Sequence, residues 1–196
     1  MKLVGVSQRA DYLIDRKETR DAVDQRLLEF VRASGGVGVP VPNNLASEDD
    51  FDTWIKAVNI EAVLLSGGPD VGICLNRDKT ETNLLNYAFK NSLPLLGICR
   101  GMQMIAIWAG AELKKVIGHA GTRHQVAGYF NGEVNSYHNY SLREIPANFT
   151  ALVYSEDGLI EAIKHQNLKW EGWMWHPERE NRFSARDIER LGTLLQ

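Results

Sequence analysis

Three features that define other classes of protein are missing from this sequence of 196 residues. It has only two cysteines, Cys74 and Cys99, and no apolar run approaches the ~18 residues that span a bilayer. Its 22 basic and 25 acidic residues give a net charge of -3, and the basic ones form no stripe. We therefore expect no disulfide framework, no membrane segment and no nucleic-acid polymer as a partner.

Signals for export and for metal binding are also missing. Met1 and Lys2 lead directly into Leu3 to Val6, a stretch too short for the apolar region of a signal peptide, so we expect a cytoplasmic protein with free thiols. The spacing of His119, His124 and His165 is not typical of metal ligands, and paired cysteines are absent. We expect neither a metal nor a cofactor.

The composition that remains, 44% hydrophobic and 24% charged, is typical of a globular domain, and we expect one catalytic domain over residues 1–196. Short apolar runs alternate with segments whose apolar residues recur at three and four positions, a rhythm that indicates parallel strands joined by helices. We therefore predict an α/β fold with a doubly wound, mostly parallel, flavodoxin-like sheet and helices on both faces. The predicted strands are 3–6, 37–41, 62–65 and 95–99, and the predicted helices are 22–33, 48–57 and 83–91.

The pattern changes after Ala111 to shorter runs broken by turn residues, which predicts a mixed or antiparallel extension of the sheet. These runs are 132–134, 151–155, 160–164 and 170–175. A last helix is expected to begin near Ser184, where Asp187 completes a capping-box pattern. Asp78, with Glu81 three residues later, is a candidate N-cap for the third helix.

Cys99 lies in the pattern Gly-x-Cys-x-Gly, at the point where an apolar strand opens into a helical segment. Glycines at Gly97 and Gly101 would relieve the crowding of a sharp strand-to-helix turn, which exposes the side chain at its apex. The positive end of the following helix dipole stabilises a thiolate there. We interpret Cys99 as a nucleophile, and the alternative is a small buried core residue.

Gly67 and Gly68 follow another predicted strand. Because the carboxyl ends of neighbouring parallel strands face one crevice, the backbone N–H groups of these glycines can point at a substrate held over Cys99. We assign them to an oxyanion hole, and an ordinary turn is the alternative, since Gly-Gly-Pro-Asp suits one.

His176 and Glu178 are separated by one residue, so in an extended chain both side chains project to the same side. This makes His176 a candidate base and Glu178 its orienting carboxylate, which together with Cys99 complete a catalytic triad. A surface ion pair is the alternative. Trp173 and Trp175 face the other way and are expected in the core, whereas Trp170 is a candidate for stacking on a base.

These motifs together resemble the class I glutamine amidotransferase superfamily over nearly the whole chain. Within it, four segments resemble the γ-glutamyl hydrolase branch, also described as peptidase C26-like: 77–81, 99–101, 135–138 and 157–162. A closer resemblance, carried by segments 134–140, 174–176 and 178–180, is to the hydrolases of γ-glutamyl-CDP-amidate in capsular phosphoramidate biosynthesis. Those γ-glutamyl hydrolases that act on γ-glutamyl-aminobutyrate or folates usually have His and Gln where this chain has Asn139 and Tyr140.

The resemblance implies a hydrolase that releases glutamate through a glutamyl thioester, from a small γ-glutamyl substrate such as a cytidine nucleotide conjugate. It also implies roles for further residues. N–H groups near Gly68 and Arg100 would meet the oxyanion, while Gln103 and the Ser136-Tyr137 backbone would hold the amino acid head. Gln103 is alternatively a solvated helix residue, and His138 either contacts the leaving group or is a hydrogen-bonded structural histidine.

Three other functions stay open at this point. The chain is alternatively a γ-glutamyl-aminobutyrate-type hydrolase, or the glutaminase subunit of an amidotransferase that supplies ammonia to a synthetase partner. The third alternative is a catalytically silent binding protein. The Cys99-Arg100-Gly101 elbow resembles that of the freestanding hydrolases and no synthetase domain is fused to the chain, so we expect no obligatory protein partner, and a homo-oligomer stays open.

Overall fold

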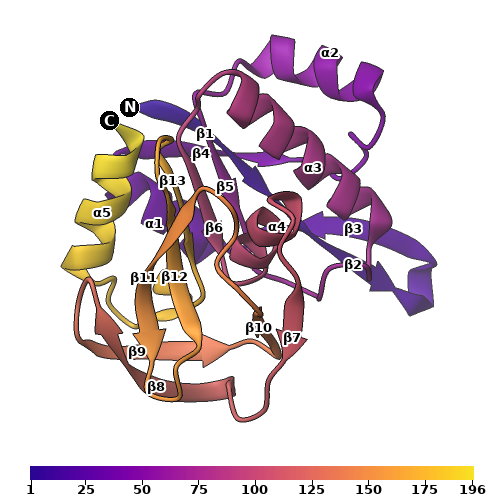
Figure 1. Ribbon diagram of the computed structural model, residues 1–196. Coiled ribbons are helices and arrows are strands. Elements are labelled where there is room, and N and C mark those ends of the chain that lie inside the picture. The colour runs from indigo at the N-terminus through magenta and orange to yellow at the C-terminus, as the bar shows by residue number, and fades with distance from the viewer.

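The computed structural model describes residues 1–196 and is built around a nine-stranded sheet (Figure 1). Five strands run parallel, in the spatial order β4-β1-β5-β6-β13, and four antiparallel strands continue the sheet as β12-β11-β8-β9. The predicted α/β fold, mostly parallel with an antiparallel extension, is confirmed. The strands are β1 (Lys2–Ser7), β4 (Gly36–Val41), β5 (Ala62–Leu65), β6 (Leu95–Ile98), β8 (Ala120–Gly128), β9 (Gly132–Tyr137), β11 (Phe149–Ser155), β12 (Ile160–His165) and β13 (Trp170–Trp173).

Helices cover both faces of the parallel strands, so these strands are apolar on both sides. In β5, Val63 and Leu65 pack against α2 (Glu48–Val58), α3 (Leu75–Lys90) and α4 (Arg100–Trp108), which lie together on one side in Figure 1. Ala62 and Leu64 pack instead with residues of α1 (Gln25–Ala33) and α5 (Ala185–Leu195) on the opposite face. The alternation of side chains along one strand therefore fills two separate cores.

Two small two-stranded sheets lie outside the nine-stranded sheet. β2 (Arg9–Leu13) pairs with β3 (Glu18–Ala22), and β7 (Leu113–Lys115) pairs with β10 (Tyr140–Leu142). The β2–β3 hairpin shortens the first predicted helix, because Ala22 ends a strand and the helix begins at Gln25. The carboxylate of Asp24 caps that helix by accepting from the Arg26 N–H at 2.9 Å.

The predicted N-cap of the third helix is wrong. α3 begins at Leu75, after Cys74, so Asp78 lies in its first turn rather than before it. The Asp78 carboxylate accepts instead from the Gly72 N–H at 2.8 Å and from Arg100. The start of α5 after Ser184 agrees with the prediction, but Ser184 makes no side-chain capping bond.

β13 ends at Trp173, two residues earlier than predicted, and Pro177–Arg179 form a 3-10 turn. Trp170 is fully buried, its indole N–H donates to the Leu93 carbonyl at 3.0 Å, and its ring centroid lies 5.2 Å from that of Trp108. The suggestion that Trp170 stacks on a base is therefore wrong. None of the helices combines the length and apolar character that crossing a membrane requires.

Two glycines allow β6, β5 and α4 to approach closely. A Cβ added to Gly97 would lie 2.5 Å from the backbone of Gly101, and one added to Gly101 would lie 2.1 Å from the carbonyl oxygen of Leu65. Both contacts are far shorter than van der Waals separation and involve backbone, which cannot rotate away. The strand-to-helix crossing at Cys99 therefore depends on the absence of side chains at these two positions.

We predict that Gly101→Ala lowers the free energy of unfolding by about 3 kcal/mol, because the added methyl group forces α4 away from β5. Gly132→Ala is the matched control, since a Cβ there meets nothing closer than 3.9 Å. It should change the stability by less than about 0.5 kcal/mol. Urea unfolding of both variants measures the difference, and equal stabilities would contradict the packing role of Gly101.

Candidate active site

Cys99 lies between β6 and α4 with a φ of 51° and a ψ of -104°, a conformation that non-glycine residues rarely adopt. Its N–H donates to the Trp173 carbonyl at 2.7 Å, and its carbonyl accepts from the Gln103 N–H at 3.1 Å. The neighbouring strand and helix thus hold the strained residue in place. Cys99 has the backbone of a nucleophile elbow, with its thiol at the amino end of α4.

His176 lies beside Cys99 and forms a buried pair with Glu178. His176 Nδ1 is 2.6 Å from Glu178 Oε1, and both residues are less than 5% exposed. Burial lowers the pKa of His176, but hydrogen bonds to Cys99 and Glu178 and their charges outweigh it and raise this pKa to about 9. The two side chains meet through the 3-10 turn that follows β13 rather than through extended chain as expected.

Asn135 fixes the backbone of His176, a role that sequence reasoning missed. Its amide oxygen accepts from the His176 N–H at 2.9 Å, and its amide nitrogen donates to the His176 carbonyl at 2.8 Å. The same nitrogen donates to Glu180 at 2.8 Å. Asn135 belongs to a motif that the sequence singles out, but its long separation from His176 hides the contact.

The backbone N–H groups of Gly67 and Gly68 donate to no group of the protein. Arg77 explains their orientation, because its Nη2 donates to the carbonyls of Ser66 at 2.8 Å and Gly67 at 3.1 Å. The C=O and N–H of a trans peptide point in opposite directions, so both N–H groups point away from Arg77. Gly68 also has a φ of 148°, and a Cβ there would strike Arg77. Gly67 lies against the His176 ring, since a Cβ added there would lie 2.5 Å from its Cε1, and two free donors beside His176 suit an oxyanion hole.

A buried ion network lies beneath these groups. Glu81 is fully buried and accepts from Arg77 Nε at 2.9 Å, from Arg100 and from the Ser7 hydroxyl at 2.8 Å. Burial raises the pKa of Glu81, but the charges of Arg77 and Arg100 outweigh it and lower the pKa below its ordinary value. Two nitrogens of the Arg100 side chain are therefore committed to Glu81 and Asp78, and its Nε is buried without a partner. The backbone N–H of Arg100, in the first turn of α4, is the group placed to meet a substrate.

Gln103 is 3% exposed, so the alternative of a solvated helix residue is wrong. Its amide nitrogen donates to the Tyr140 carbonyl at 3.0 Å. Both residues line a hollow of about 410 Å³, together with Asp70, Val71 and Leu113. This hollow begins one helical turn from Cys99, which places Gln103 between the thiol and a space that can receive a substrate.

The three residues of segment 136–138 differ in their exposure. Ser136 is buried, and its hydroxyl donates to the His119 carbonyl. Tyr137 is 45% exposed, and its ring centroid lies 5.6 Å from that of His176. The His138 side chain is fully buried, with Nδ1 3.0 Å from the Tyr140 carbonyl and Nε2 facing Glu161. The structure therefore favours a structural role for His138 over a contact with the leaving group.

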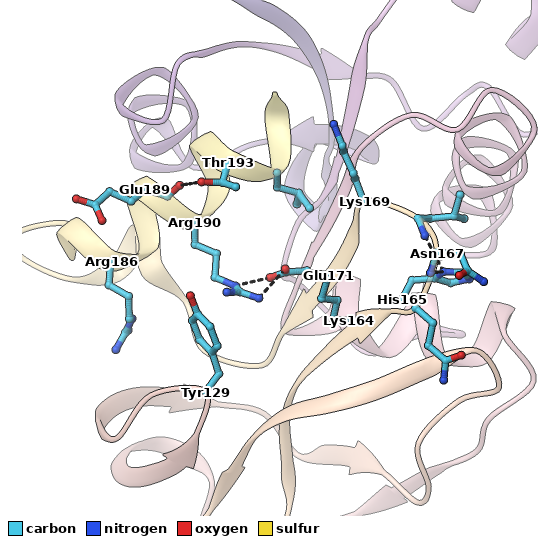
Figure 2. Close-up of a pocket in the computed structure, with 13 residues that line it drawn as sticks. Tyr129, Lys164, His165, Asn167, Lys169, Glu171, Arg186, Glu189, Arg190 and Thr193 are labelled. Atoms are coloured by element: carbon cyan, nitrogen blue, oxygen red, sulfur yellow. Dashed lines mark hydrogen bonds and ion pairs between the residues drawn. The ribbon is translucent and has the colours of Figure 1, made fainter.

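A larger hollow, of about 570 Å³, lies away from this site (Figure 2). Lys169 and Glu171, at the amino end of β13, line it together with Arg190 of α5, which pairs with Glu171 at 2.7 Å. Cys99, Gly67 and His176 all follow the carboxyl ends of their strands. The volume of a hollow therefore does not identify the site, whereas the topology of the parallel sheet does.

Comparison with known proteins agrees with this geometry. Residues 19–191 match the family model described as glutamine amidotransferase class-I, and the chain belongs to that family. The chain is 36% identical over 151 residues to the gamma-glutamyl-CDP-amidate hydrolase of Campylobacter jejuni, covering 72% of each protein. It is 32% identical over 183 residues to a glutamine-hydrolyzing GMP synthase subunit of Pyrococcus abyssi, covering 84% of this chain and 88% of that one.

A solved structure supports the fold assignment. A protein from Thermoplasma acidophilum, described as a GMP synthase subunit, superposes with a TM-score of 0.76 at 20% identity. The match covers 100% of this chain and 94% of that one. At this level of identity the likeness concerns the fold.

We predict that His176 titrates near pH 9 and that Glu178→Gln lowers this midpoint, because a neutral amide stabilises imidazolium less than a carboxylate does. A raised pKa in the folded state stabilises the fold fully below pH 6.5, and this contribution is lost as the pH rises through about 9. NMR titration of the imidazole in both proteins measures the midpoints. His165 is an internal control, since burial lowers its pKa and Glu178 does not contact it. An unchanged His176 midpoint in Glu178→Gln would contradict the pairing.

Proposed function

We propose that this chain hydrolyses a γ-glutamyl amide bond through a glutamyl thioester on Cys99 and releases L-glutamate. The observation that carries the proposal is the strained Cys99 at the amino end of α4, next to the buried His176–Glu178 pair. The preferred substrate in this proposal is γ-L-glutamyl-CDP-amidate, and the second product is cytidine diphosphoramidate, used in capsule polysaccharide modification. Similarity to the Campylobacter jejuni hydrolase supports this choice.

The proposed reaction has two steps. His176 takes the thiol proton, the thiolate of Cys99 attacks the γ-carbonyl carbon, and the N–H groups of Gly68 and Arg100 stabilise the oxyanion. The tetrahedral intermediate collapses, the C–N bond breaks, and protonated His176 gives its proton to the leaving nitrogen. His176 then accepts a proton from water, which attacks the thioester carbon, and the C–S bond breaks to free glutamate and the thiolate. Glu178 orients and stabilises the imidazolium.

The substrate would be held by two kinds of contact. Gln103 and the backbone of Ser136 and Tyr137 would bind the α-amino and α-carboxylate groups, since Gln103 lines the hollow next to the elbow. The leaving group would lie over Tyr137, whose exposed ring carries the Arg179 guanidinium 4.5 Å from its centroid. The only carboxylate near Arg179 is Glu178, at 3.9 Å. This ion pair is long, so Arg179 keeps guanidinium N–H groups that can pair with a diphosphate.

A second candidate function is the glutaminase component of an amidotransferase, which would supply ammonia to a synthetase. Similarity to the GMP synthase subunit of Pyrococcus abyssi favours it, because that relative covers more of the chain than the hydrolase does. The two functions differ in the leaving group and in the need for a partner. A glutaminase component would hydrolyse glutamine best and would depend on its synthetase for full activity, whereas the proposed hydrolase would act alone.

We predict that Cys99→Ala abolishes glutamate release, by a factor on the order of 10⁴ or more, while the far-UV circular dichroism spectrum is unchanged. His176→Ala should be nearly as severe. Glu178→Gln should be milder, because the carboxylate transfers no proton itself. Glutamate release from γ-glutamyl-CDP-amidate measures all three. Near-normal turnover by Cys99→Ala, or a harsher loss in Glu178→Gln than in His176→Ala, would contradict the assigned roles.

We predict that kcat/KM for γ-glutamyl-CDP-amidate exceeds that for glutamine and for γ-glutamyl-aminobutyrate. The γ-glutamyl half is common to all three, so the preference must come from contacts to the leaving group, which also help to orient the scissile bond. Arg179→Gln should lower kcat/KM for the nucleotide substrate about 10-fold or more and spare glutamine, since a charged hydrogen bond contributes about 1.5–3 kcal/mol.

Arg123→Gln is the matched control for this test. Arg123 is already paired with Glu133 at 2.6 Å and with Glu180 at 2.9 Å, so it should contribute little to phosphate binding. Equal kcat/KM values for glutamine and the nucleotide amide would exclude the proposed substrate. An effect of Arg123→Gln as large as that of Arg179→Gln would exclude the proposed diphosphate contact.

A further inference from the structure

Three histidines and one glutamate from distant parts of the sequence converge in the antiparallel extension of the sheet, and we refer to these four side chains as the three-histidine cluster. His119 immediately precedes β8, His124 lies within β8, His138 follows β9, and Glu161 lies in β12. Their side chains are from 0% to 13% exposed. The proposed reaction uses none of these four side chains.

Glu161 lies at the centre of the cluster. Its Oε2 is 3.5 Å from His124 Nε2, and its Oε1 is 3.4 Å from His138 Nε2 and 4.0 Å from His119 Nδ1. These separations exceed the 2.7–2.9 Å of a charge-assisted hydrogen bond. All five of these nitrogen and oxygen atoms are buried and have no hydrogen-bond partner. Such a concentration of unsatisfied buried atoms requires an explanation.

The outer hydrogen bonds fix the tautomers of two rings. His119 Nε2 lies 3.0 Å from Asp157 Oδ2, and His138 Nδ1 lies 3.0 Å from the Tyr140 carbonyl. A carboxylate and a carbonyl can only accept, so each of these nitrogens carries a proton. In the neutral rings, His119 Nδ1 and His138 Nε2 therefore present lone pairs toward the Glu161 carboxylate, which is also an acceptor. An imidazole that donates its outer N–H to an oxygen and directs its other lone pair inward is typical of a metal ligand.

We propose that the three-histidine cluster binds one divalent transition-metal cation of the zinc type. The ligands are His119 Nδ1, His124 Nε2 and a Glu161 carboxylate oxygen, and His138 Nε2, which lies 3.4 Å from Glu161 Oε1, is the candidate fourth ligand. Ligand atoms 2.0–2.2 Å from a tetrahedral ion lie about 3.4 Å from one another. The ligand atoms of His119, His124 and Glu161 already lie within 4.8 Å of one another, so side-chain displacements of roughly 1 Å bring these three to tetrahedral spacing. His138 lies outside this group of three and must move further to become the fourth ligand.

The choice of cation follows from the donor set. Three imidazole nitrogens favour zinc and its transition-metal neighbours, whereas magnesium and calcium prefer oxygen ligands. Four protein ligands leave no position open for water, which makes the site structural rather than catalytic. The half-exposed side chain of Asp157, which touches His119, marks the route from solvent.

The metal would position the segment that follows β9. The Tyr140 carbonyl accepts from His138 and also from Gln103, so one peptide group joins the cluster to α4. The ion would tie β8, β9 and β12 together and thereby fix Ser136 and Tyr137 beside His176. This role is independent of the proposed reaction and of its substrate.

The test measures metal content in the Cys99→Ala background, so that the active-site thiol cannot bind the ion. The protein is stripped with a chelator, reloaded with excess Zn²⁺ or Co²⁺, and desalted. We expect one ion per chain by mass spectrometry and the visible absorption bands of tetrahedral Co²⁺. Zn²⁺ should raise the melting temperature by roughly 5–10 °C, because it binds only the folded state.

Two further variants keep the test specific to the cluster. Glu161→Gln preserves the side-chain volume and His124→Ala removes a ligand, and each should lose the tightly bound ion and the thermal shift. His165→Ala is the matched control, because His165 is a buried histidine on the same strand as Glu161 but accepts from the Asn167 and Leu168 N–H groups. It should retain one ion. The proposal would be overturned if the Cys99→Ala protein held far less than one ion per chain. It would also be overturned if Glu161→Gln and His124→Ala kept as much metal as the Cys99→Ala protein.

Discussion

Two arginines and one fully buried glutamate hold together the elements that carry the candidate active site. Glu81 of α3 binds Arg77 of the same helix and Arg100 of α4, and Ser7 at the end of β1 donates to it as well. A buried ion network of this kind need not raise stability, because desolvation opposes the attraction between the charges. Its effect is geometric: it joins the carboxyl end of the sheet to the helix whose first turn follows Cys99, and through Arg77 it fixes the direction of the Gly67 and Gly68 peptides.

The features that could be predicted from the sequence are local ones. The strands β1, β5 and β6 are short apolar runs, and the elbow at Cys99 and the His176–Glu178 pair each lie within a few residues. The features that could not be predicted depend on distant contacts. Asn135 and His176 meet only because the antiparallel extension folds back, and Trp170 is buried because Phe89 and Trp108 cover it. His119, His124 and Glu161 show no metal-like spacing because distant segments of the antiparallel extension bring them together.

The same division separates the groups that would act on any γ-glutamyl amide from those proposed to select the leaving group. The elbow, the two free N–H groups and the His176–Glu178 pair all follow parallel strands and would serve any γ-glutamyl amide. Tyr137 and Arg179, the groups that we propose distinguish a nucleotide from ammonia, lie at the end of β9 and in the turn after β13. Membership of the class I glutamine amidotransferase family therefore indicates the type of reaction more firmly than it indicates the leaving group.

Histidine has two opposite roles in the parallel part of the sheet and in its antiparallel extension. His176 faces a thiol and a carboxylate that both favour its proton, which raises its pKa to about 9 and keeps the ring protonated near neutral pH. In the three-histidine cluster, the tautomers of His119 and His138 direct lone pairs at the Glu161 carboxylate, an arrangement that suits a cation. The Tyr140 carbonyl links His138 to Gln103, so a rigid antiparallel extension would hold Ser136 and Tyr137 at a fixed position relative to Cys99. Precision at the thiol would then depend on both halves of the sheet.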